Sequence, residues 1–258
     1  MKYVIGLDVG TTGTKALVVD EAGNVLGSGY QGYSLLTRGD CVEQDAGAWW
    51  KAAVGAVRQA CEGQDISKIA AIGLSTQGAT MLAVDAEGNP IGNTLTWMDT
   101  RASQEAEELG DKLGVTALYQ KTGWRPSPTL DAAKILYMKR RAEYGKAKKY
   151  LSTLEFMNWK LTGEMVVDPT NAGIRQLYNI ENDDWDDEIL AAIGCTRAEL
   201  PVLKKTGESL GQLTKDAAEA LGLPQSTVVY NGAHDQYCAS IGSCLLYTSR
   251  PCRRLASP

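Results

Sequence analysis

The stretch that decides the fold lies near the start of the chain: Tyr3-Val4-Ile5-Gly6-Leu7-Asp8-Val9-Gly10-Thr11-Thr12-Gly13-Thr14-Lys15. Residues 3–9 are an apolar run typical of a buried strand, and the next four residues have the composition of a tight turn. Apolar runs return over residues 14–20 and, after a second short turn, over residues 25–33. Three runs joined by such short turns predict an antiparallel three-stranded meander.

The patterns further along the chain predict an α/β fold with a mixed sheet. Apolar residues at helical spacing indicate a helix over residues 45–61. Further strands are expected over residues 66–75, 79–84, 94–98, 208–213 and 227–230. Between residues 100 and 205 the pattern is mainly helical and indicates a large insertion or cap. Within it, helices are expected over residues 101–113, 129–143, 153–161 and 185–192.

Composition excludes several classes of protein. The 258 residues include 26 Lys and Arg against 31 Asp and Glu, and this acidic balance argues against a nucleic-acid partner. No apolar run approaches the roughly 20 residues that cross a membrane, and the first residues lack the pattern of a signal peptide. We therefore expect a cytoplasmic protein without a membrane partner. Scattered cysteines and a single histidine exclude a zinc set.

The first segment that carries chemistry follows the first predicted strand. Asp8 ends that strand, and the small residues of the Gly10-Thr11-Thr12-Gly13 turn allow backbone N–H groups to approach phosphate oxygens. Lys15 supplies a positive charge, and Asp8 suits a hydrated Mg²⁺ that also binds phosphates. A plain β-turn explains the same residues equally well, and the Walker pattern is absent.

A second glycine-rich segment is not a nucleotide site. Gly27-Ser28-Gly29-Tyr30-Gln31-Gly32 matches the letters of the dinucleotide-binding pattern, but it lies inside the third predicted strand. It opens no helix, and the positive end of a helix is what binds the pyrophosphate in such sites. We therefore reject this interpretation.

Asp235 lies where a late strand passes into a helix that we expect to open at His234. A carboxylate in this place is either an N-cap or a general base that takes a proton from a hydroxyl. His234 beside it would suit a hydrolase, but the nucleophile pattern GxSxG is incomplete, since Gly73-Leu74-Ser75-Thr76-Gln77 ends in glutamine.

Two polar segments suggest a ligand with many hydroxyl groups. Residues 75–80 and 96–101 combine amides, hydroxyls, a carboxylate and the indole of Trp97. Polar groups of this kind pair with hydroxyls, while an aromatic ring packs on the face of a sugar. Taken alone this pattern is weak, because a tryptophan is more often part of a core.

Taken together and in order, these motifs resemble those of the FGGY carbohydrate kinases, which share a superfamily with actin and the heat-shock ATPases. The resemblance runs from residue 3 to about residue 242. The segments that carry it are residues 8–15, 72–77, 97–101, 168–172, 184–187 and 232–236, with Gln44-Asp45, Trp49-Trp50, Leu200-Pro201 and Gly211-Gln212.

The resemblance implies a ribonuclease H-like α/β domain, with a mixed sheet and a helical insertion. It also implies transfer of phosphate from ATP, with Mg²⁺, to a sugar or polyol hydroxyl. By the family's pattern Asp235 is the catalytic base, Gln236 a neighbouring substrate contact and Asp8 the carboxylate linked to Mg²⁺. The hairpin that meets the ATP phosphates comprises Thr11, Thr12, Gly13 and Lys15. The residues that contact or border the acceptor are Gln77, Gly78, Trp97, Asp99 and Thr129.

Departures from the family's patterns reduce the range of sugars and polyols that are expected as the acceptor. Glycerol kinases carry an Arg-Glu pair after the glutamine, where this chain has Gly78-Ala79, and this argues against glycerol. Xylulokinases often carry a histidine before Gly-Ala-Thr, and Gln77 takes that place here. The Gly78-Ala79-Thr80 match still favours a pentulose such as xylulose, with another ketose or polyol as the alternative.

The match to the family's pattern ends near Gly242. We expect residues 1–242 to be the N-terminal kinase domain and residues 243–258 a non-native tail, with the second, nucleotide-binding domain absent. Since catalysis in the family depends on closure between two domains, we expect little or no kinase activity from this chain. A homodimer is a further expectation. The alternatives are a non-catalytic sugar- or nucleotide-binding module of the same fold and an actin-like structural ATPase, against which Asp235-Gln236 argues.

Overall fold

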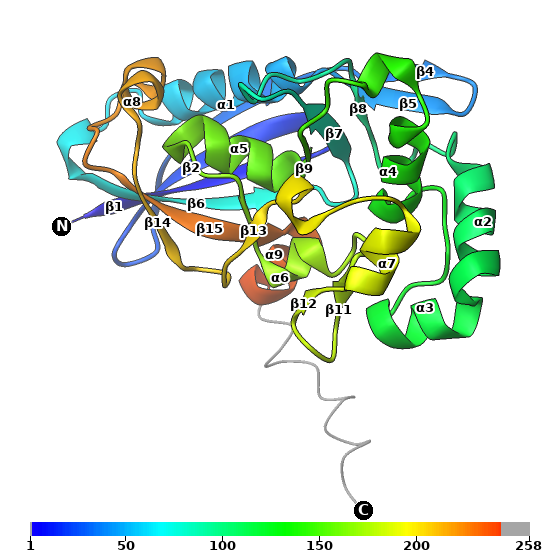
Figure 1. The fold of residues 1–258 in the computed structure, drawn as a ribbon. Coiled ribbons are helices and arrows are strands. Elements are labelled where there is room, and N and C mark those ends of the chain that lie inside the picture. Colours follow the sequence, from blue (N-terminus) through cyan, green and yellow to red (C-terminus); the bar gives the residue numbers. More distant parts are fainter. Residues whose placement is uncertain (1, 244–258) are drawn as a thin grey trace, which may run out of the picture.

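A six-stranded mixed sheet forms the centre of the computed structural model, which describes residues 2–243 (Figure 1). The strands lie in the order β14-β15-β6-β1-β2-β3. Their bounds are Tyr3–Val9 for β1, Gly13–Asp20 for β2, Val25–Gly32 for β3, Ile69–Thr76 for β6, Ser209–Gln212 for β14 and Val228–His234 for β15. The predicted meander β1-β2-β3 is confirmed, while β6 runs parallel to β1 and β15 runs parallel to β6. Apart from Ser243, the expected tail lies outside the described residues.

Helix α1 (Ala46–Ala60) confirms the helix predicted over residues 45–61, and it covers one face of the meander. It begins after Asp45, whose side chain accepts a hydrogen bond from the Gly47 N–H group. The glycines of β3 allow the helix to approach closely: a Cβ atom on Gly27 would lie 2.1 Å from the Ala60 carbonyl oxygen. This contact accounts for the dinucleotide-like letters in β3, because glycine is needed there for packing.

Two further helices complete this layer. Helices α5 (Thr153–Thr162) and α8 (Lys215–Leu221) lie on the same side of the sheet as α1 and contact it (Figure 1). Thr214 caps the start of α8, and Gly222 ends it in the left-handed conformation. The buried side chains of β1, which are Ile5, Leu7 and Val9, point into this core.

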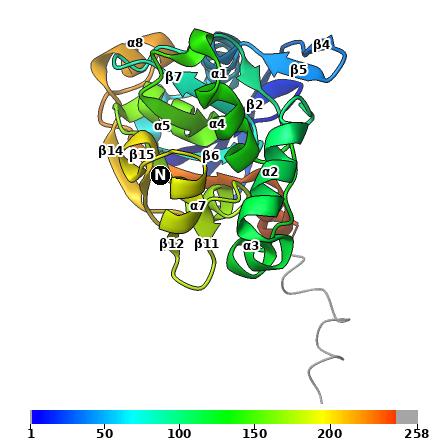
Figure 2. The ribbon, with the colours of Figure 1, turned by 45° about the vertical axis from the view of Figure 1, so that its right-hand side comes forward.

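A second sheet and core occupy the other end of the molecule. The sheet has the order β4-β5-β8-β7-β9, and its strands span Leu36–Arg38, Cys41–Gln44, Thr94–Leu95, Met81–Val84 and Lys149–Ser152 respectively. Figure 2 brings forward the helices packed at this end, which are α2 (Ser103–Leu113), α3 (Val115–Thr122), α4 (Asp131–Lys139) and α7 (Asp187–Ala192). Apolar residues from these helices and strands form a core separate from the one beneath α1.

The segment over residues 100–205 is mainly helical, as the sequence predicts, but it also contains short strands that the sequence does not predict. Besides β9, it contains the paired short strands β10 (Val166–Val167) with β13 (Val202–Leu203) and β11 (Tyr178–Asn179) with β12 (Asp184–Trp185), and the short helix α6 (Pro169–Ala172). Strands of two residues show no periodicity, and β9 joins its sheet by pairing with the distant β7. The helix expected over residues 129–143 is shorter, because Leu130 is extended and a separate 3-10 turn covers Ala142–Tyr144.

The parallel strands β1, β6 and β15 finish at the same edge of the central sheet. Asp8 lies opposite Ser75, and Ser75 lies opposite Ala233. Because side chains alternate along a strand and Leu7 and Val9 face α1, Asp8 lies on the other face. Asp235 follows two residues after Ala233, so the topology brings both aspartates to one edge. Among the helices of residues 2–243, none is long and apolar enough to cross a bilayer.

Candidate active site

A hollow of about 390 Å³ lies at this edge of the sheet. Its lining, here called the Asp8 hollow, consists of Asp8, Ser75, Asp235, Gln236 and Ala239. The Ser75 hydroxyl donates a hydrogen bond of 2.7 Å to Asp8 Oδ1, which fixes one carboxylate oxygen and leaves the other directed to solvent. Since Ser75 pairs with a carboxylate and not with a histidine, its geometry gives no support to a hydrolase.

Asp235 is the first residue of helix α9 (Asp235–Gly242) and does not act as its cap. His234 occupies the cap position, and no side chain makes a capping hydrogen bond there. The Asp235 carboxylate is 35% exposed, with the His234 Nε2 atom 3.4 Å from its Oδ1. A carboxylate that does not cap its own helix is available to accept a proton.

His234 does not neutralise this carboxylate at neutral pH. Burial lowers the pKa of the His234 imidazole below its usual value, although the negative charges of Asp235 and Asp168 act in the opposite direction. The backbone N–H of His234 donates to the Thr170 hydroxyl, which in turn donates to Asp168. This link between α6 and the end of β15 holds the residue before Asp235 in place.

A second, larger hollow of about 440 Å³ adjoins the first and is here called the Trp97 pocket. Its lining consists of Thr11, Gln77, Gly78, Ala79, Trp97, Trp124, Thr129, Leu130, Ile174, His234, Asp235 and Gln236. Trp97 and Trp124 are 47% and 41% exposed, which is unusual for residues this large and apolar. Asp235 and Gln236 line both hollows, so the carboxylate stands between them.

A chain of hydrogen bonds joins the hairpin after β1 to the Trp97 pocket. The Thr11 hydroxyl donates to Gln77 Oε1 at 3.0 Å and accepts from Trp97 Nε1 at 3.1 Å. Gln77 in turn donates to Gln44 Oε1 at 2.8 Å, and Gln44 donates to the Thr11 carbonyl oxygen. Movement of the hairpin would therefore move one wall of the pocket.

The hairpin itself is tightly braced. The Gly10 N–H donates to the Gly13 carbonyl oxygen at 3.0 Å, and the Tyr33 hydroxyl donates to the Gly10 carbonyl oxygen. Burial raises the pKa of Tyr33 to about 12, so this hydroxyl stays protonated. Gly13 leaves no room for a side chain, since a Cβ atom there would lie 2.5 Å from the Tyr30 hydroxyl oxygen. Thr12 and Lys15 are exposed, and Lys15 pairs with Asp8 in the register of β1 and β2.

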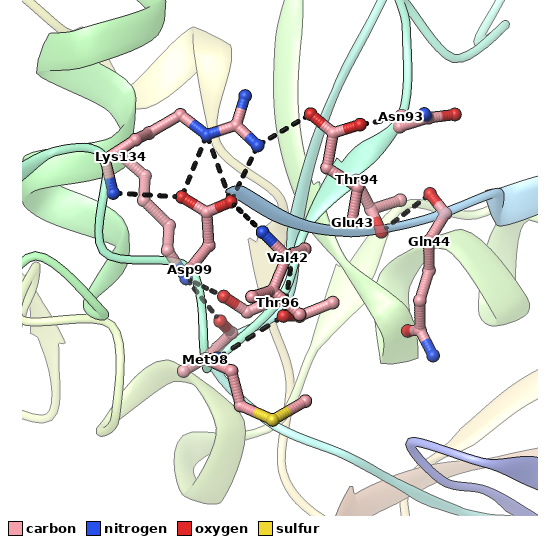
Figure 3. A network of polar contacts seen from close by, with 11 residues as sticks. Val42, Glu43, Gln44, Asn93, Thr94, Thr96, Met98, Asp99 and Lys134 are labelled. Atoms are coloured by element: carbon pink, nitrogen blue, oxygen red, sulfur yellow. Dashed lines mark hydrogen bonds and ion pairs between the residues drawn. The ribbon is translucent and has the colours of Figure 1, made fainter. Parts of the chain in front are cut away.

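Of the residues expected near the acceptor, Asp99 lies outside both hollows. It is fully buried, and its carboxylate accepts hydrogen bonds from Arg101 Nε at 2.9 Å and from the Val42 N–H at 2.8 Å (Figure 3). Arg101 also pairs with Glu43 at 2.6 Å. This network, seen from close by in Figure 3, braces the backbone that carries Trp97.

The other expected acceptor residues, Gln77, Gly78, Trp97, Thr129 and Gln236, all line the Trp97 pocket. Sequence reasoning missed Trp124, Leu130 and Ile174 in the same lining. Trp124 and Ile174 belong to the long segment interpreted as a cap, and no spacing in the sequence connects them. A partial signal existed for Trp124, because a tryptophan outside every predicted apolar period is a candidate for a binding wall.

Comparison with known proteins places the chain in a family. Residues 3–242 match the model of the N-terminal domain of the FGGY family of carbohydrate kinases. The chain belongs to this family. It is 28% identical to the xylulose kinase of Staphylococcus xylosus over 94% of this chain and 51% of that protein. It is 32% identical to the glycerol kinase of Thermococcus onnurineus (strain NA1) over 96% of this chain and 51% of that protein.

A solved FGGY structure agrees with the fold. The gluconate kinase of Lactobacillus acidophilus superimposes with a TM-score of 0.88 at 28% identity, covering 93% of this chain and 49% of that one. The chain thus spans about half the length of the curated relatives it matches. The relatives are carbohydrate kinases named for different acceptors, so family membership alone leaves the acceptor open.

Proposed function

We propose that this FGGY chain provides the acceptor pocket and catalytic base of a kinase that transfers phosphate from ATP to a sugar hydroxyl, most favourably that of a pentulose such as xylulose. The observation that carries the proposal is the position of Asp235, which lines both the Trp97 pocket and the Asp8 hollow. An acceptor in the first and a phosphoryl group over the second would meet at this carboxylate. A cytoplasmic location, where ATP is available, is part of the same proposal.

The chemistry needs few groups. The acceptor oxygen forms a bond to the γ-phosphorus while the bond from that phosphorus to the ADP oxygen breaks, and the hydroxyl proton passes to Asp235. Removal of this proton and in-line positioning are the main tasks of the protein in phosphoryl transfer. Thr11, Thr12, Gly13 and Lys15 would face the phosphates, with backbone N–H groups, hydroxyls and one cation as donors.

The residues of the Asp8 hollow suit Mg²⁺. One Asp8 oxygen is oriented by Ser75, and Asp235 lines the same hollow, so two carboxylates are available. Mg²⁺ typically binds one or two carboxylates together with phosphates and water. Asp8 would hold the ion, and when bound it would neutralise the charge of the phosphates. Within residues 2–243, no three His, Cys, Asp or Glu side chains form a metal-binding group.

The surroundings of Gly78 support a pentulose over glycerol. A Cβ atom on Gly78 would lie 2.0 Å from Ile174 Cδ1 and 2.3 Å from His234 Cδ2, so a side chain there requires these two side chains to move. The arginine expected at this position in glycerol kinases could not be placed without moving both neighbours. A volume of about 440 Å³ walled by two tryptophans suits a ligand larger than glycerol.

Titration of the purified chain with D-xylulose, glycerol and D-gluconate, followed by calorimetry, tests the acceptor. We expect saturable binding of D-xylulose that is about tenfold or more tighter than that of glycerol. Equal or tighter binding of glycerol would overturn the pentulose assignment and leave the kinase assignment standing. Absence of binding for every sugar and polyol tested would overturn the acceptor pocket itself.

Turnover is measured separately, because the chain spans about half of its relatives. Residues 1–242 are joined to the second half of a xylulose kinase, and formation of ADP is followed with and without D-xylulose. We expect ADP formation that depends on the sugar in the joined protein, and little in the chain alone. Binding of D-xylulose without sugar-dependent turnover in a folded joined protein would favour a non-catalytic binding module.

A further inference from the structure

Lys134 is a fully buried lysine that the proposed reaction does not use. It lies on α4, and its Nζ atom donates hydrogen bonds of 2.8 Å to the carbonyl oxygens of Ala79 and Thr96. Figure 3 shows the side chain reaching toward Thr96 beside Asp99. Among residues 2–243, no carboxylate lies within the 4.0 Å of an ion pair to this ammonium.

Both carbonyl oxygens belong to walls of the Trp97 pocket. Ala79 lies in the segment that follows β6, and it lines the pocket together with Gly78. Thr96 lies in the segment that follows β8, directly before the pocket residue Trp97. Helix α4 starts directly after Leu130, which also lines the pocket. Three segments that are far apart in the sequence therefore meet at one ammonium group.

The backbone of Ala79 needs such an anchor. Its φ angle is +49°, in the left-handed region that residues with a Cβ atom rarely adopt. This conformation persists only where the surroundings hold it. The Lys134 ammonium fixes the Ala79 carbonyl direction, and with it the position of Gly78 against Ile174 and His234.

The placement of Lys134 is a costly way to stabilise a core. Burial lowers the pKa of Lys134 to about 8, even though Asp131 and Asp99 raise it, while Arg101 lowers it further. A buried cation without a carboxylate partner is poorly compensated, and an apolar side chain of similar size often stabilises a core equally well. Such a residue is better explained by the geometry that it imposes on its two acceptors.

We infer that Lys134 is a positioning residue of the acceptor pocket, which sets the separation of the Gly78 and Trp97 walls by binding one backbone carbonyl of each. This inference rests on the proposed function only in taking a sugar as the ligand of the pocket. The hydrogen bonds from Lys134 to the two walls do not depend on which ligand binds.

The test compares Lys134→Met with Lys139→Met in the purified chain. Lys139 lies on the same helix but pairs with Glu199 outside the pocket, so its substitution removes the same charge elsewhere. We expect D-xylulose to bind about tenfold or more weakly to Lys134→Met. The affinity of Lys139→Met should equal that of the unmodified chain, and both variants should unfold cooperatively in urea.

A second measurement needs no ligand. Hydrogen exchange should show faster exchange of the amides in residues 77–81 and 95–99 in Lys134→Met, and unchanged exchange there in Lys139→Met. If Lys134→Met does not fold, Lys134→Gln replaces it, since its amide can still donate to one of the two carbonyls and an intermediate effect is expected.

The outcomes separate the two proposals. Unchanged exchange in both segments would overturn the positioning role, and so would unchanged affinity in a chain that binds D-xylulose. A chain that binds no sugar, yet loses protection in both segments on substitution of Lys134, would overturn the proposed acceptor and leave the positioning of the walls intact.

Discussion

Two groups of charged residues in this molecule differ in how completely they are paired. Arg175 is fully buried, and its guanidinium binds Asp131 at 2.6 Å and Glu155 at 2.9 Å. At the edge of the central sheet, by contrast, Asp8 has one hydroxyl partner, and Asp235 has a neutral imidazole 3.4 Å away. The buried carboxylates are committed to an arginine, whereas those at the edge are open to solvent.

The difference separates the carboxylates that hold the shape from those that we propose take part in the chemistry. A buried carboxylate that is bound to an arginine is held in place and is not accessible to a ligand. A carboxylate on a hollow surface, without a cation bound to it, can accept one. By this criterion Asp99 belongs to the first group and Asp235 to the second, while the open Asp8 is the carboxylate proposed to hold Mg²⁺.

The largest expected effect is on catalysis, and it tests the open carboxylate of Asp235 at the edge of the central sheet. In the protein joined to the second half of a xylulose kinase, Asp235→Asn should lower kcat by about 10²–10⁴-fold, because the amide cannot take the proton. D-Xylulose affinity should change little, since the shape is kept. Asp216→Asn, a substitution in the first turn of α8 away from both hollows, is the matched control. Unchanged kcat in Asp235→Asn would remove the base role.

The next effect tests the paired group. Arg175→Met leaves Asp131 and Glu155 buried without a cation, and should lower the free energy of unfolding by about 3–5 kcal/mol. Urea denaturation of the chain followed by circular dichroism measures this loss. Arg197→Met is the control, because Arg197 binds Asp184 and Asp187 at the surface, where solvent screens the pairs and the midpoint should barely move. Equal losses of unfolding free energy in the two variants would contradict the special role of the buried ion pairs.

A smaller effect is expected at Gly78, which lines the Trp97 pocket beside the open carboxylate Asp235. Gly78→Ala puts a methyl group against Ile174 and His234, and should cost about 1–3 kcal/mol of unfolding free energy. The same change should weaken D-xylulose binding. Gly73→Ala in β6 is the control, since a Cβ atom there meets nothing within 4 Å. A tolerated Gly78→Ala with unchanged affinity would show that the contact does not shape the pocket.

The smallest effect is a pH dependence at Lys134. Its folded pKa of about 8 lies below the usual value for lysine, so the unfolded chain binds more protons between the two values. Stability therefore rises with pH above about 8, and is lost as the pH falls through 8. Compared with Lys134→Met, the unmodified chain should gain roughly 1 kcal/mol or more between pH 8 and pH 10 in urea denaturation. Parallel pH profiles for the two would contradict the lowered pKa.

Local patterns predicted the elements that carry the two aspartates. The alternation of Ile5, Leu7 and Val9 indicates a strand with one buried face, which places Asp8 on the other. The side chain of Asp45, at the start of the helix predicted over residues 45–61, caps that helix through a hydrogen bond to its own neighbour Gly47. Such signals act over a few residues, and the structure confirms them almost to the residue.

Contacts between distant segments were beyond that reach. The pairing of strand β9 and the positions of Trp124 and Ile174 in the pocket depend on residues far away in the sequence. No pattern among neighbouring residues predicts them. Asp99 illustrates the same limit, because the resemblance placed its carboxylate near the acceptor, whereas in the structure it binds an arginine. Only the structure shows that Arg101, which also pairs with Glu43, binds the Asp99 carboxylate.

The sequence by itself determined the meander, the helix that covers it, and the places of Asp8 and Asp235 at the ends of predicted strands, because backbone periodicity and capping are properties of neighbouring residues. The tertiary structure alone decided which carboxylates stay open, which walls enclose the Trp97 pocket, and that a buried lysine joins two of them. Those properties depend on where side chains from separate elements meet, and burial and pairing exist only once the chain has packed.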